Sequence, residues 1–276
     1  MIDLHLHTTA SDGCSTPDML IRQLRDAGID TFAIADHDTV AAVAETADLA
    51  GRAGLRFIPG VEITAVHRSK DVHVLAYFVD SASPALRSFF EASCADRLRR
   101  ARAMGEKLAE LGVPVDIDAL IEASGGANSG KSIARPSVAR ALVNAGHVAS
   151  VQEAFDRYLA NDRPAYVPRT GASPAAVIDL VRSAGGITSF AHPGTTAMDE
   201  LIPEMVDAGL DAIECYHSEH SPEVTERYLR CADQYGLAVS GGSDFHGEGT
   251  RRAECLGRVG LPEECLSALM ARAGRA

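Results

Sequence analysis

The chain has 276 residues, of which 46% are hydrophobic and 23% charged, as expected for one large globular α/β domain or a domain with a modest insertion. Its formal net charge of -12 argues against a protein that grips nucleic acid broadly through a cationic surface. No apolar run reaches the length of a membrane span, no export signal precedes Ile2, and the six cysteines form no CxxC pair. We therefore expect a cytoplasmic protein with reduced thiols.

Short apolar stretches alternate with amphipathic ones, which predicts strands separated by helices and a parallel sheet closed, or nearly closed, into a barrel. Two helices should begin at Thr16-Pro17 and Ser173-Pro174, where a capping hydroxyl precedes a proline. The expected strands are Ile2–His7, Thr31–Ala35, Arg56–Ile63, Val72–Val79, Gly186–Ala191, Ala212–Tyr216 and Ala238–Gly241. The expected helices between them are Pro17–Ala27, Val40–Ala53, Pro174–Ala184, Met198–Ala208 and Pro222–Tyr235.

The alternation breaks between about residues 83 and 168. A long helical run, Ala85–Leu111, carries four arginines in its middle, namely Arg97, Arg99, Arg100 and Arg102. A glycine-rich turn at 125–130 follows, and then two short helices, expected at Pro136–Ala145 and Val151–Leu159. We expect residues 1–82 and 169–276 to form the β/α barrel and residues 83–168 to form a helical insertion that caps the site. A second, independently packed lobe is the alternative.

Nine side chains of the types that bind metal ions form five short clusters, each where a predicted strand ends. They are His5, His7, Asp12, His37, Glu62, His73, His192, Asp244 and His246. Residues two apart in a strand face the same way, so His5 and His7 can both reach one ion. The carboxyl ends of strands carry the chemistry of parallel α/β folds, so the clusters should converge at one mouth of the barrel. A lone His73 or His192 is more often a core histidine, but nine such residues together predict a multinuclear metal site.

Mixed imidazole and carboxylate ligands suit Zn, Mn or Fe, and the absence of cysteine from the set disfavours a structural zinc site. Nine ligands are too many for one ion, so we expect two or three divalent ions, with Glu62 bridging two of them. Asp38 would ordinarily cap the helix that follows it. Alternation along the strand should turn Asp36 away from His37, so we expect Asp36 to hold a ligand residue or the loop and not to bind an ion itself.

Five ordered segments resemble the motifs of the PHP (polymerase and histidinol phosphatase) superfamily. They are Asp3–Thr8 with Ser11–Gly13, Asp36–Asp38, Gly60–Glu62, Ala191–Pro193 and Gly242–His246. The resemblance covers residues 1 to about 250 and implies a distorted seven-stranded, TIM-like β/α barrel with up to three metal ions at its mouth. It implies three ligand sets: His5, His7, Glu62 and Asp244; Glu62, His73 and His192; and Asp12, His37 and His246. Some members carry histidine where this chain has Asp12, which would make the third site more anionic.

The helical insertion looks most similar to that of small stand-alone phosphoesterases acting on nucleotides, including 3′,5′-bisphosphates and the 5′ ends of short RNA. In these relatives, arginines from two stretches hold the substrate phosphate; here the stretches are Asp96–Arg102 and Ile133–Arg140. The resemblance thus implies Arg97 and Arg135 as substrate-binding residues. For Arg97, a solvated helix face is the alternative.

Together these features predict a metal-dependent phosphatase that hydrolyses phosphate monoesters of nucleotides by in-line attack of a metal-bound hydroxide. Asp244 and His192 should be indispensable for turnover. If the leaving group needs a proton, His217 and a metal-bound water are the two candidate donors. We expect a small phosphorylated substrate, no membrane and no stable nucleic-acid partner, and leave the oligomeric state open. One alternative is a histidinol-phosphate phosphatase with the same metals. The second alternative is not an enzyme but a non-catalytic metal-binding PHP module.

Overall fold

The computed structural model describes residues 1–123, 135–168 and 170–275, and the predicted glycine-rich turn at 125–130 lies outside them. The chain divides into two compact units. We call Met1–Phe89 with Gly171–Ala276 the sheet unit, and Phe90–Thr170 the helical unit. Within the described ranges, no helix combines the length and the apolar character that crossing a bilayer requires.

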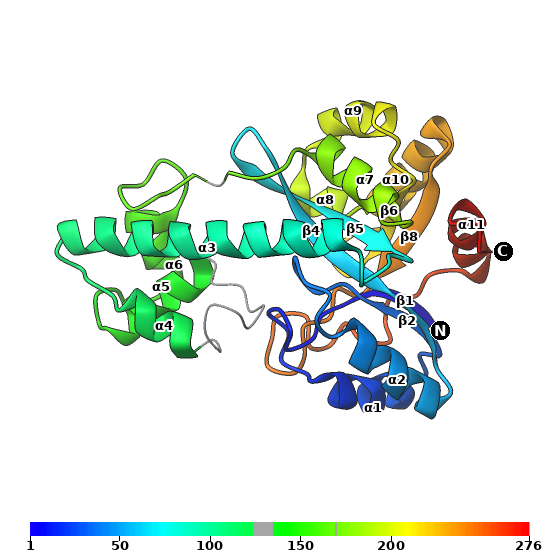
Figure 1. Cartoon of the computed structure of the whole chain (residues 1–276), viewed down its shortest axis with the longest axis horizontal. Helices are drawn as coiled ribbons and strands as arrows, with labels where there is room; N and C mark the ends of the chain where they lie inside the picture. The colour runs from blue at the N-terminus through cyan, green and yellow to red at the C-terminus, as the bar shows by residue number, and fades with distance from the viewer. Residues whose placement is uncertain (124–134, 169, 276) are drawn as a thin grey trace. The chain divides into compact units, whose positions relative to one another are not determined.

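The sheet unit holds eight strands in two sheets (Figure 1). The first sheet has the order β1-β2-β3 and is parallel throughout. The second has the order β4-β5-β6-β7-β8 and is mixed. The strands are β1 (Ile2–Leu6), β2 (Thr31–Ile34), β3 (Arg56–Ile58), β4 (Gly60–His67), β5 (Lys70–Tyr77), β6 (Ile187–Phe190), β7 (Ala212–His217) and β8 (Ala238–Gly242).

The prediction of one parallel sheet of seven strands was wrong in two respects. The strand expected at Arg56–Ile63 is interrupted at Pro59, whose missing N–H cannot donate to a sheet ladder, so β3 and β4 are separate strands. β5 also runs antiparallel to both of its neighbours. Only two residues join β4 to β5, and Arg68 and Ser69 have φ angles of 48° and 64°, as in tight hairpin turns. So short a connection cannot return the chain to a parallel strand.

The two sheets meet where the predicted metal ligands lie. No closed barrel forms among the described strands; instead, isolated bridges pair Leu6 with Phe245 and His37 with Glu62 across the sheets. The backbone N–H of His7 donates to the carbonyl of Phe245 at 2.9 Å. These backbone contacts hold segments that are far apart in the sequence side by side.

Helices cover the sheets, and several begin as predicted. Thr16 Oγ1 accepts a hydrogen bond from the N–H of Met19, and Ser173 Oγ accepts one from Ala176, each at 3.3 Å, so both predicted caps are confirmed. The helices of this unit are α1 (Pro17–Asp26), α2 (Val43–Ala53), α7 (Pro174–Ser183), α8 (Pro193–Thr196), α9 (Ile202–Asp207), α10 (Pro222–Tyr235) and α11 (Glu263–Arg272), with a 3₁₀ turn, η2 (Asp199–Leu201), before α9.

Burial of β1 brings polar side chains into the interior of the sheet unit. All five residues of β1 are buried. Leu6 joins a core formed by α1, α2 and β2, which includes Leu20 and Phe32. Because neighbouring residues in a strand face opposite sides, Asp3 and His5 face away from that core, toward the other sheet.

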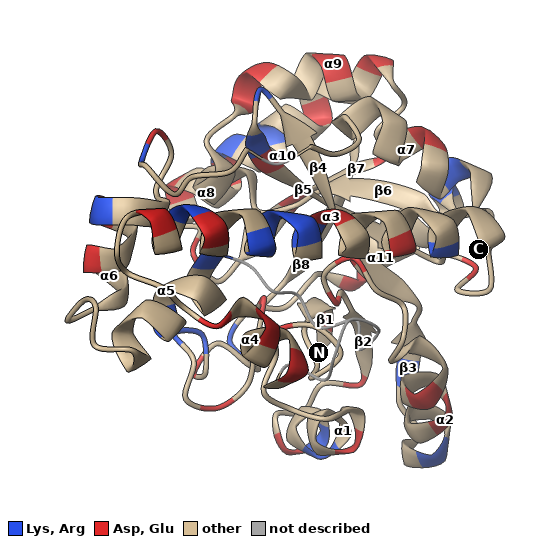
Figure 2. Ribbon diagram, turned by 60° about the vertical axis from the view of Figure 1, so that its left-hand side comes forward, with Lys and Arg blue, Asp and Glu red and all other residues tan. Residues whose placement is uncertain are grey.

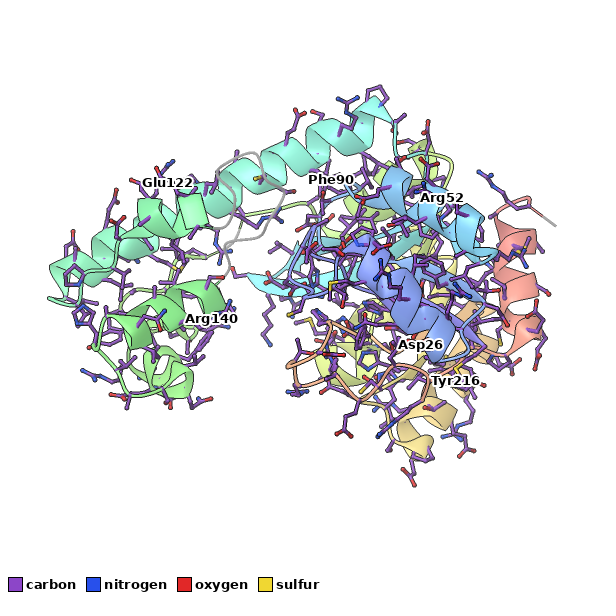
Figure 3. All side chains as sticks on the ribbon, turned by 90° about the horizontal axis from the view of Figure 1, so that it is seen from below. Asp26, Arg52, Phe90, Glu122, Arg140 and Tyr216 are labelled. Atoms are coloured by element: carbon purple, nitrogen blue, oxygen red, sulfur yellow. The ribbon has the colours of Figure 1, made fainter. Side chains whose placement is uncertain are left out.

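The helical unit has its own apolar core. α3 (Pro84–Glu110) begins in the sheet unit and continues into the helical unit, and it carries both acidic and basic residues (Figure 2). The remaining helices are α4 (Ile117–Ala123), α5 (Arg135–Asn144), α6 (Val151–Ala154) and a π-helical turn, η1 (Phe155–Leu159). Figure 3 shows Glu122 on α4 and Arg140 on α5. The buried core of this unit includes Met104, Leu108, Val138, Leu142 and Leu159.

Candidate metal centre

Glu62, buried on β4, lies at the centre of the nine predicted ligands. Its Oε1 is 2.9 Å from His73 Nδ1 and 2.9 Å from His192 Nε2. Its Oε2 is 3.3–3.4 Å from ring nitrogens of His5, His7 and His37. Five imidazoles from four separate parts of the chain therefore surround one carboxylate.

Two further carboxylates extend this arrangement. Asp244 Oδ1 lies 3.0 Å from His7 Nε2. Asp12 is half exposed; its two oxygens lie 3.4 Å from His246 Nε2 and 3.8 Å from His37 Nε2. All nine predicted ligands therefore form one contiguous cluster, which we call the His/Asp/Glu cluster.

The atoms of this cluster suit divalent ions better than hydrogen bonds with one another. Among the described residues, the buried atoms His73 Nδ1, His7 Nε2 and Asp244 Oδ1 have no hydrogen-bond partner, although each lies within 3.0 Å of an oppositely charged or polar atom of the cluster. With metal bonds of about 2.0–2.2 Å, neighbouring ligands of one ion lie roughly 3.0–3.5 Å apart, as these atoms do. Three groups have ligand atoms within 4.8 Å of one another: His7, Asp12, His37 and His246; His5, His7 and Asp244; and His37, Glu62 and His73.

The electrostatics of the cluster keep its carboxylates ionised, whereas its imidazoles divide into two groups. Burial alone would raise the pKa of Glu62 and of Asp244, but the surrounding imidazoles hold both pKa values well below the ordinary range. Burial lowers the pKa of His7 and of His192. Burial also opposes the charged forms of His5 and His73, but neighbouring carboxylates raise the pKa of both. Ionised carboxylates and neutral imidazoles are the forms that coordinate divalent ions.

Three residues of the cluster or next to it have unusual backbone conformations. The φ angles are 50° at Asp38, 27° at His192 and 53° at Asp244. Residues with a Cβ rarely adopt positive φ, at a cost of about 1–3 kcal/mol each, and such residues concentrate at functional sites. Asp38 is held by its side chain, which accepts hydrogen bonds from the N–H and the hydroxyl of Thr64 at 2.7 and 2.9 Å. The chain thus tolerates strain at the points where it turns ligands inward.

His73 reaches the cluster by an unpredicted route. β5 is antiparallel and His73 is the fourth of its eight residues, so the prediction that every cluster follows the end of a parallel strand was wrong here. The carbonyl of His73 accepts the N–H of Ala191 at 3.1 Å, and this contact brings His73 beside His192. Because β5 and β6 run in opposite directions, His73 lies beside the carboxyl end of β6, which His192 follows.

His217, the candidate proton donor, lies beside the cluster and is almost fully buried. Its Nε2 is 3.2 Å from Asp244 Oδ2, and its Nδ1 accepts a hydrogen bond from the N–H of Glu219 at 3.1 Å. Nδ1 is therefore unprotonated, and Nε2 carries the proton that is directed at Asp244. In this arrangement His217 orients Asp244; its role as a leaving-group acid stays a prediction.

The two predicted phosphate-binding arginines belong to the helical unit. Arg97 is buried, with 4% of its surface exposed, so it does not lie on a solvated helix face. Arg135 donates to Asn161 Oδ1 at 2.9 Å, and its guanidinium lies 5.6 Å from the centre of the Tyr166 ring. Exposed Arg99 pairs with Asp96 at 2.5 Å.

The sequence analysis missed Glu214, which holds two of the predicted ligands, His5 and His192, in place. It is fully buried on β7; its Oε1 lies 2.8 Å from His5 Nδ1, and its Oε2 accepts the backbone N–H of His192 at 2.6 Å. Burial alone would raise the pKa of Glu214, but His5 keeps it below the ordinary range. An ionised carboxylate only accepts hydrogen bonds, so Nδ1 of His5 carries the proton and Nε2 is free to face the cluster.

Two other contacts hold the loops that carry ligands. Asp36 accepts hydrogen bonds from the N–H of Thr8 at 2.8 Å and from the hydroxyl of Ser11 at 2.7 Å, which fixes the loop before Asp12. This is the indirect role expected of Asp36. Arg252, which the sequence analysis did not single out, places Nη1 2.5 Å from Asp244 Oδ2.

Glu214→Gln is expected to weaken metal binding by about 10- to 100-fold without unfolding the protein. An amide offers one oxygen and one NH₂ group, so either the His5 ring or the His192 backbone would face a donor instead of an acceptor. Titration of the metal-free protein with Mn²⁺ or Zn²⁺ measures the affinity. Glu226→Gln, at an exposed position of α10, is the matched control. Equal affinities for the wild type and Glu214→Gln would contradict the assigned role.

Known proteins resemble this chain over most of its length. The PHP domain profile matches residues 3–159. The 5′-3′ exoribonuclease Rnm of Salmonella typhimurium is 35% identical over 252 residues, 88% of this chain and 84% of that protein. The 3′,5′-nucleoside bisphosphate phosphatase of Chromobacterium violaceum is 35% identical over 257 residues, 91% of this chain and 89% of that protein. A Bifidobacterium adolescentis crystal structure, provisionally named a metal-dependent phosphoesterase, aligns with a TM-score of 0.84 at 35% identity, over 98% of this chain and 96% of that one. The chain therefore belongs to the PHP domain family.

Proposed function

We propose that this protein is a metal-dependent phosphoesterase that releases phosphate from nucleotides. The substrates proposed are a nucleoside 3′,5′-bisphosphate, an AMP-like mononucleotide or the 5′ end of a short oligoribonucleotide. The observation that carries the proposal is the position of Glu62, whose two oxygens lie within 3.4 Å of five imidazoles. The names of the exoribonuclease and bisphosphate phosphatase relatives support the nucleotide class.

The proposed cofactor is a set of two or three divalent ions, Mn, Zn or Fe, because nitrogen and oxygen ligands are mixed. When bound, such ions lower the pKa of water and neutralise the charge on the phosphoryl oxygens. We assign the ions to three ligand sets: His5, His7, Glu62 and Asp244; Glu62, His73 and His192; and Asp12, His37 and His246. The three groups whose ligand atoms lie within 4.8 Å of one another overlap these sets and support the assignment.

The residues around the ligands set the geometry and the protonation of the site. Glu214 holds the His5 ring and the turn at His192, and His217 holds one oxygen of Asp244. The buried floor of His5, His7 and Glu62 excludes bulk water, which strengthens electrostatic interactions there. The more exposed Asp12 and the neighbouring His246 form a rim through which a small anion can approach.

The helical unit is proposed to supply substrate contacts, with residues 83–168 acting as a cap. Arg97 and Arg135 remain its proposed phosphate-binding residues. A guanidinium that already bonds neutral acceptors, as Arg135 does with Asn161, can exchange them for phosphate oxygens, which form shorter and stronger charge-assisted bonds. The histidinol-phosphate and non-catalytic alternatives stay open to the assay below.

Metal-free protein reconstituted with Mn²⁺ or Zn²⁺ is expected to release phosphate from one nucleotide class. The panel holds AMP, adenosine 3′,5′-bisphosphate, a short 5′-phosphorylated RNA and histidinol phosphate. His192→Ala and Asp244→Ala should lower turnover at least about a hundredfold, because each removes a ligand of the cluster. Turnover of histidinol phosphate alone would favour the alternative phosphatase. Bound metal without turnover of any substrate would favour the non-catalytic module.

A further inference from the structure

A pocket of about 290 Å³ opens beside the His/Asp/Glu cluster. Two of its lining residues, Asp12 and His246, belong to the cluster, and the other three are the consecutive residues Thr250, Arg251 and Arg252. Its volume lies just below the range for sites of drug-sized ligands, about 300–1,000 Å³, so it suits a small group. A group seated in it would therefore lie next to the proposed metal ions and touch two arginines.

The two arginines differ in depth. Arg252 is mostly buried; its guanidinium reaches Asp244 Oδ2 at 2.5 Å and Glu219 Oε2 at 2.6 Å. Arg251 is largely exposed, with 80% of its side-chain surface accessible, and pairs with the other oxygen of Glu219. One arginine thus lies at the inner end of the pocket and the other at its outer end.

When metals are bound, the guanidinium groups of Arg251 and Arg252 together carry more positive charge than the carboxylates left to pair with them neutralise. Glu219 supplies one negative charge for the two guanidinium groups, and Asp244 belongs to the proposed ligands of an ion. Arg252 Nε is also buried without a hydrogen-bond acceptor among the described residues. An unsatisfied buried donor is costly, and phosphate oxygens are the strongest acceptors for guanidinium groups. The pocket is therefore suited to an anion.

We propose that Arg251 and Arg252 hold a second phosphate of the substrate, separate from the one being hydrolysed, and so select nucleoside bisphosphates over monophosphates. This inference rests on the proposed phosphoesterase function and names the preferred substrate class. The reacting phosphate lies at the His/Asp/Glu cluster, and the second phosphate displaces Glu219 from the arginines. Arg252 is held in place by Asp244 and Glu219, whereas the exposed Arg251 can turn toward the incoming phosphate.

The test compares substrates that differ only in the second phosphate. The full chain, loaded with Mn²⁺, is assayed on adenosine 3′,5′-bisphosphate and on the 3′- and 5′-monophosphates. For Arg251→Ala, kcat/KM on the bisphosphate is expected to fall at least about tenfold through KM, with less than about a twofold change on the monophosphates. Arg251→Lys should restore part of the preference, since it keeps the charge. Arg258→Ala, an exposed arginine outside the pocket that pairs with Glu254, should change neither.

Glu219→Gln distinguishes two roles for the arginines, namely contact with the substrate phosphate and support of the loop through the ion pair with Glu219. It removes the competing carboxylate but keeps the side-chain shape, so KM for the bisphosphate is expected to fall. A rise in KM matching that of Arg251→Ala would show that the ion pair only supports the loop, and would overturn the inference. So would an Arg251→Ala enzyme with the wild-type ratio of bisphosphate to monophosphate activity, or a loss of that ratio only in Arg135→Ala. If the wild type hydrolyses no phosphate ester, the proposed phosphoesterase function fails first.

Discussion

Glu62→Gln is expected to lower kcat/KM by at least about a thousandfold, or about 4 kcal/mol of transition-state stabilisation, while the protein stays folded. Glutamine matches glutamate in shape, so the substitution leaves no cavity on β4. It replaces one carboxylate oxygen by an NH₂ group that cannot ligate a metal and that faces imidazole nitrogens 2.9–3.4 Å away. No other carboxylate of the cluster contacts as many of its histidines.

The measurements for this variant are phosphate release, metal content by mass spectrometry and circular dichroism. His67→Ala is the matched control, because His67 ends the same strand and is not one of the nine ligands. It should keep both its metals and its activity. A Glu62→Gln enzyme that retains wild-type turnover would rule out Glu62 as the bridging ligand.

Much of the site could be predicted because its signals are local. A histidine or a carboxylate directly after an apolar run can be read from a few residues, as at His192 and Asp244. Capped helix starts such as Thr16-Pro17 are equally local. These features need no knowledge of how the strands pair.

The features that were missed depend on distant contacts or on backbone conformation. Glu214 lies inside a buried strand, 209 residues from its partner His5, and the only signal for it is a carboxylate in an otherwise apolar run. Arg252 contacts Asp244, a predicted metal ligand, but it lies eight residues later in the chain, in an irregular loop with no recognisable motif. The reversal of β5 depends on the positive φ angles of Arg68 and Ser69, residue types that do not signal such a turn.

The cluster also explains why a folded, metal-free form should be strained. Glu62 and Asp244 are buried with negative charges whose partners are imidazoles, and several of their short contacts lack hydrogen-bond geometry. The positive φ angles at His192 and Asp244 add strain at the same place. Such an arrangement is stable only when something else stabilises it, and ligands that bind the native state alone do so by mass action.

Metal removal is therefore expected to lower the melting temperature of the sheet unit by on the order of 10 °C. Free metal at about a thousand times its dissociation constant stabilises the native state by about 4 kcal/mol, and each kcal/mol shifts the melting temperature of a domain of this size by about 2–4 °C. Scanning calorimetry of the full chain, with and without excess Mn²⁺ after chelation, measures the shift. Asp244→Ala should lose most of the response and His67→Ala should keep it. An ion that binds only the native arrangement of these nine side chains must raise the melting temperature. Identical melting curves for the chelated and metal-loaded wild type would therefore show that the cluster binds no such ion.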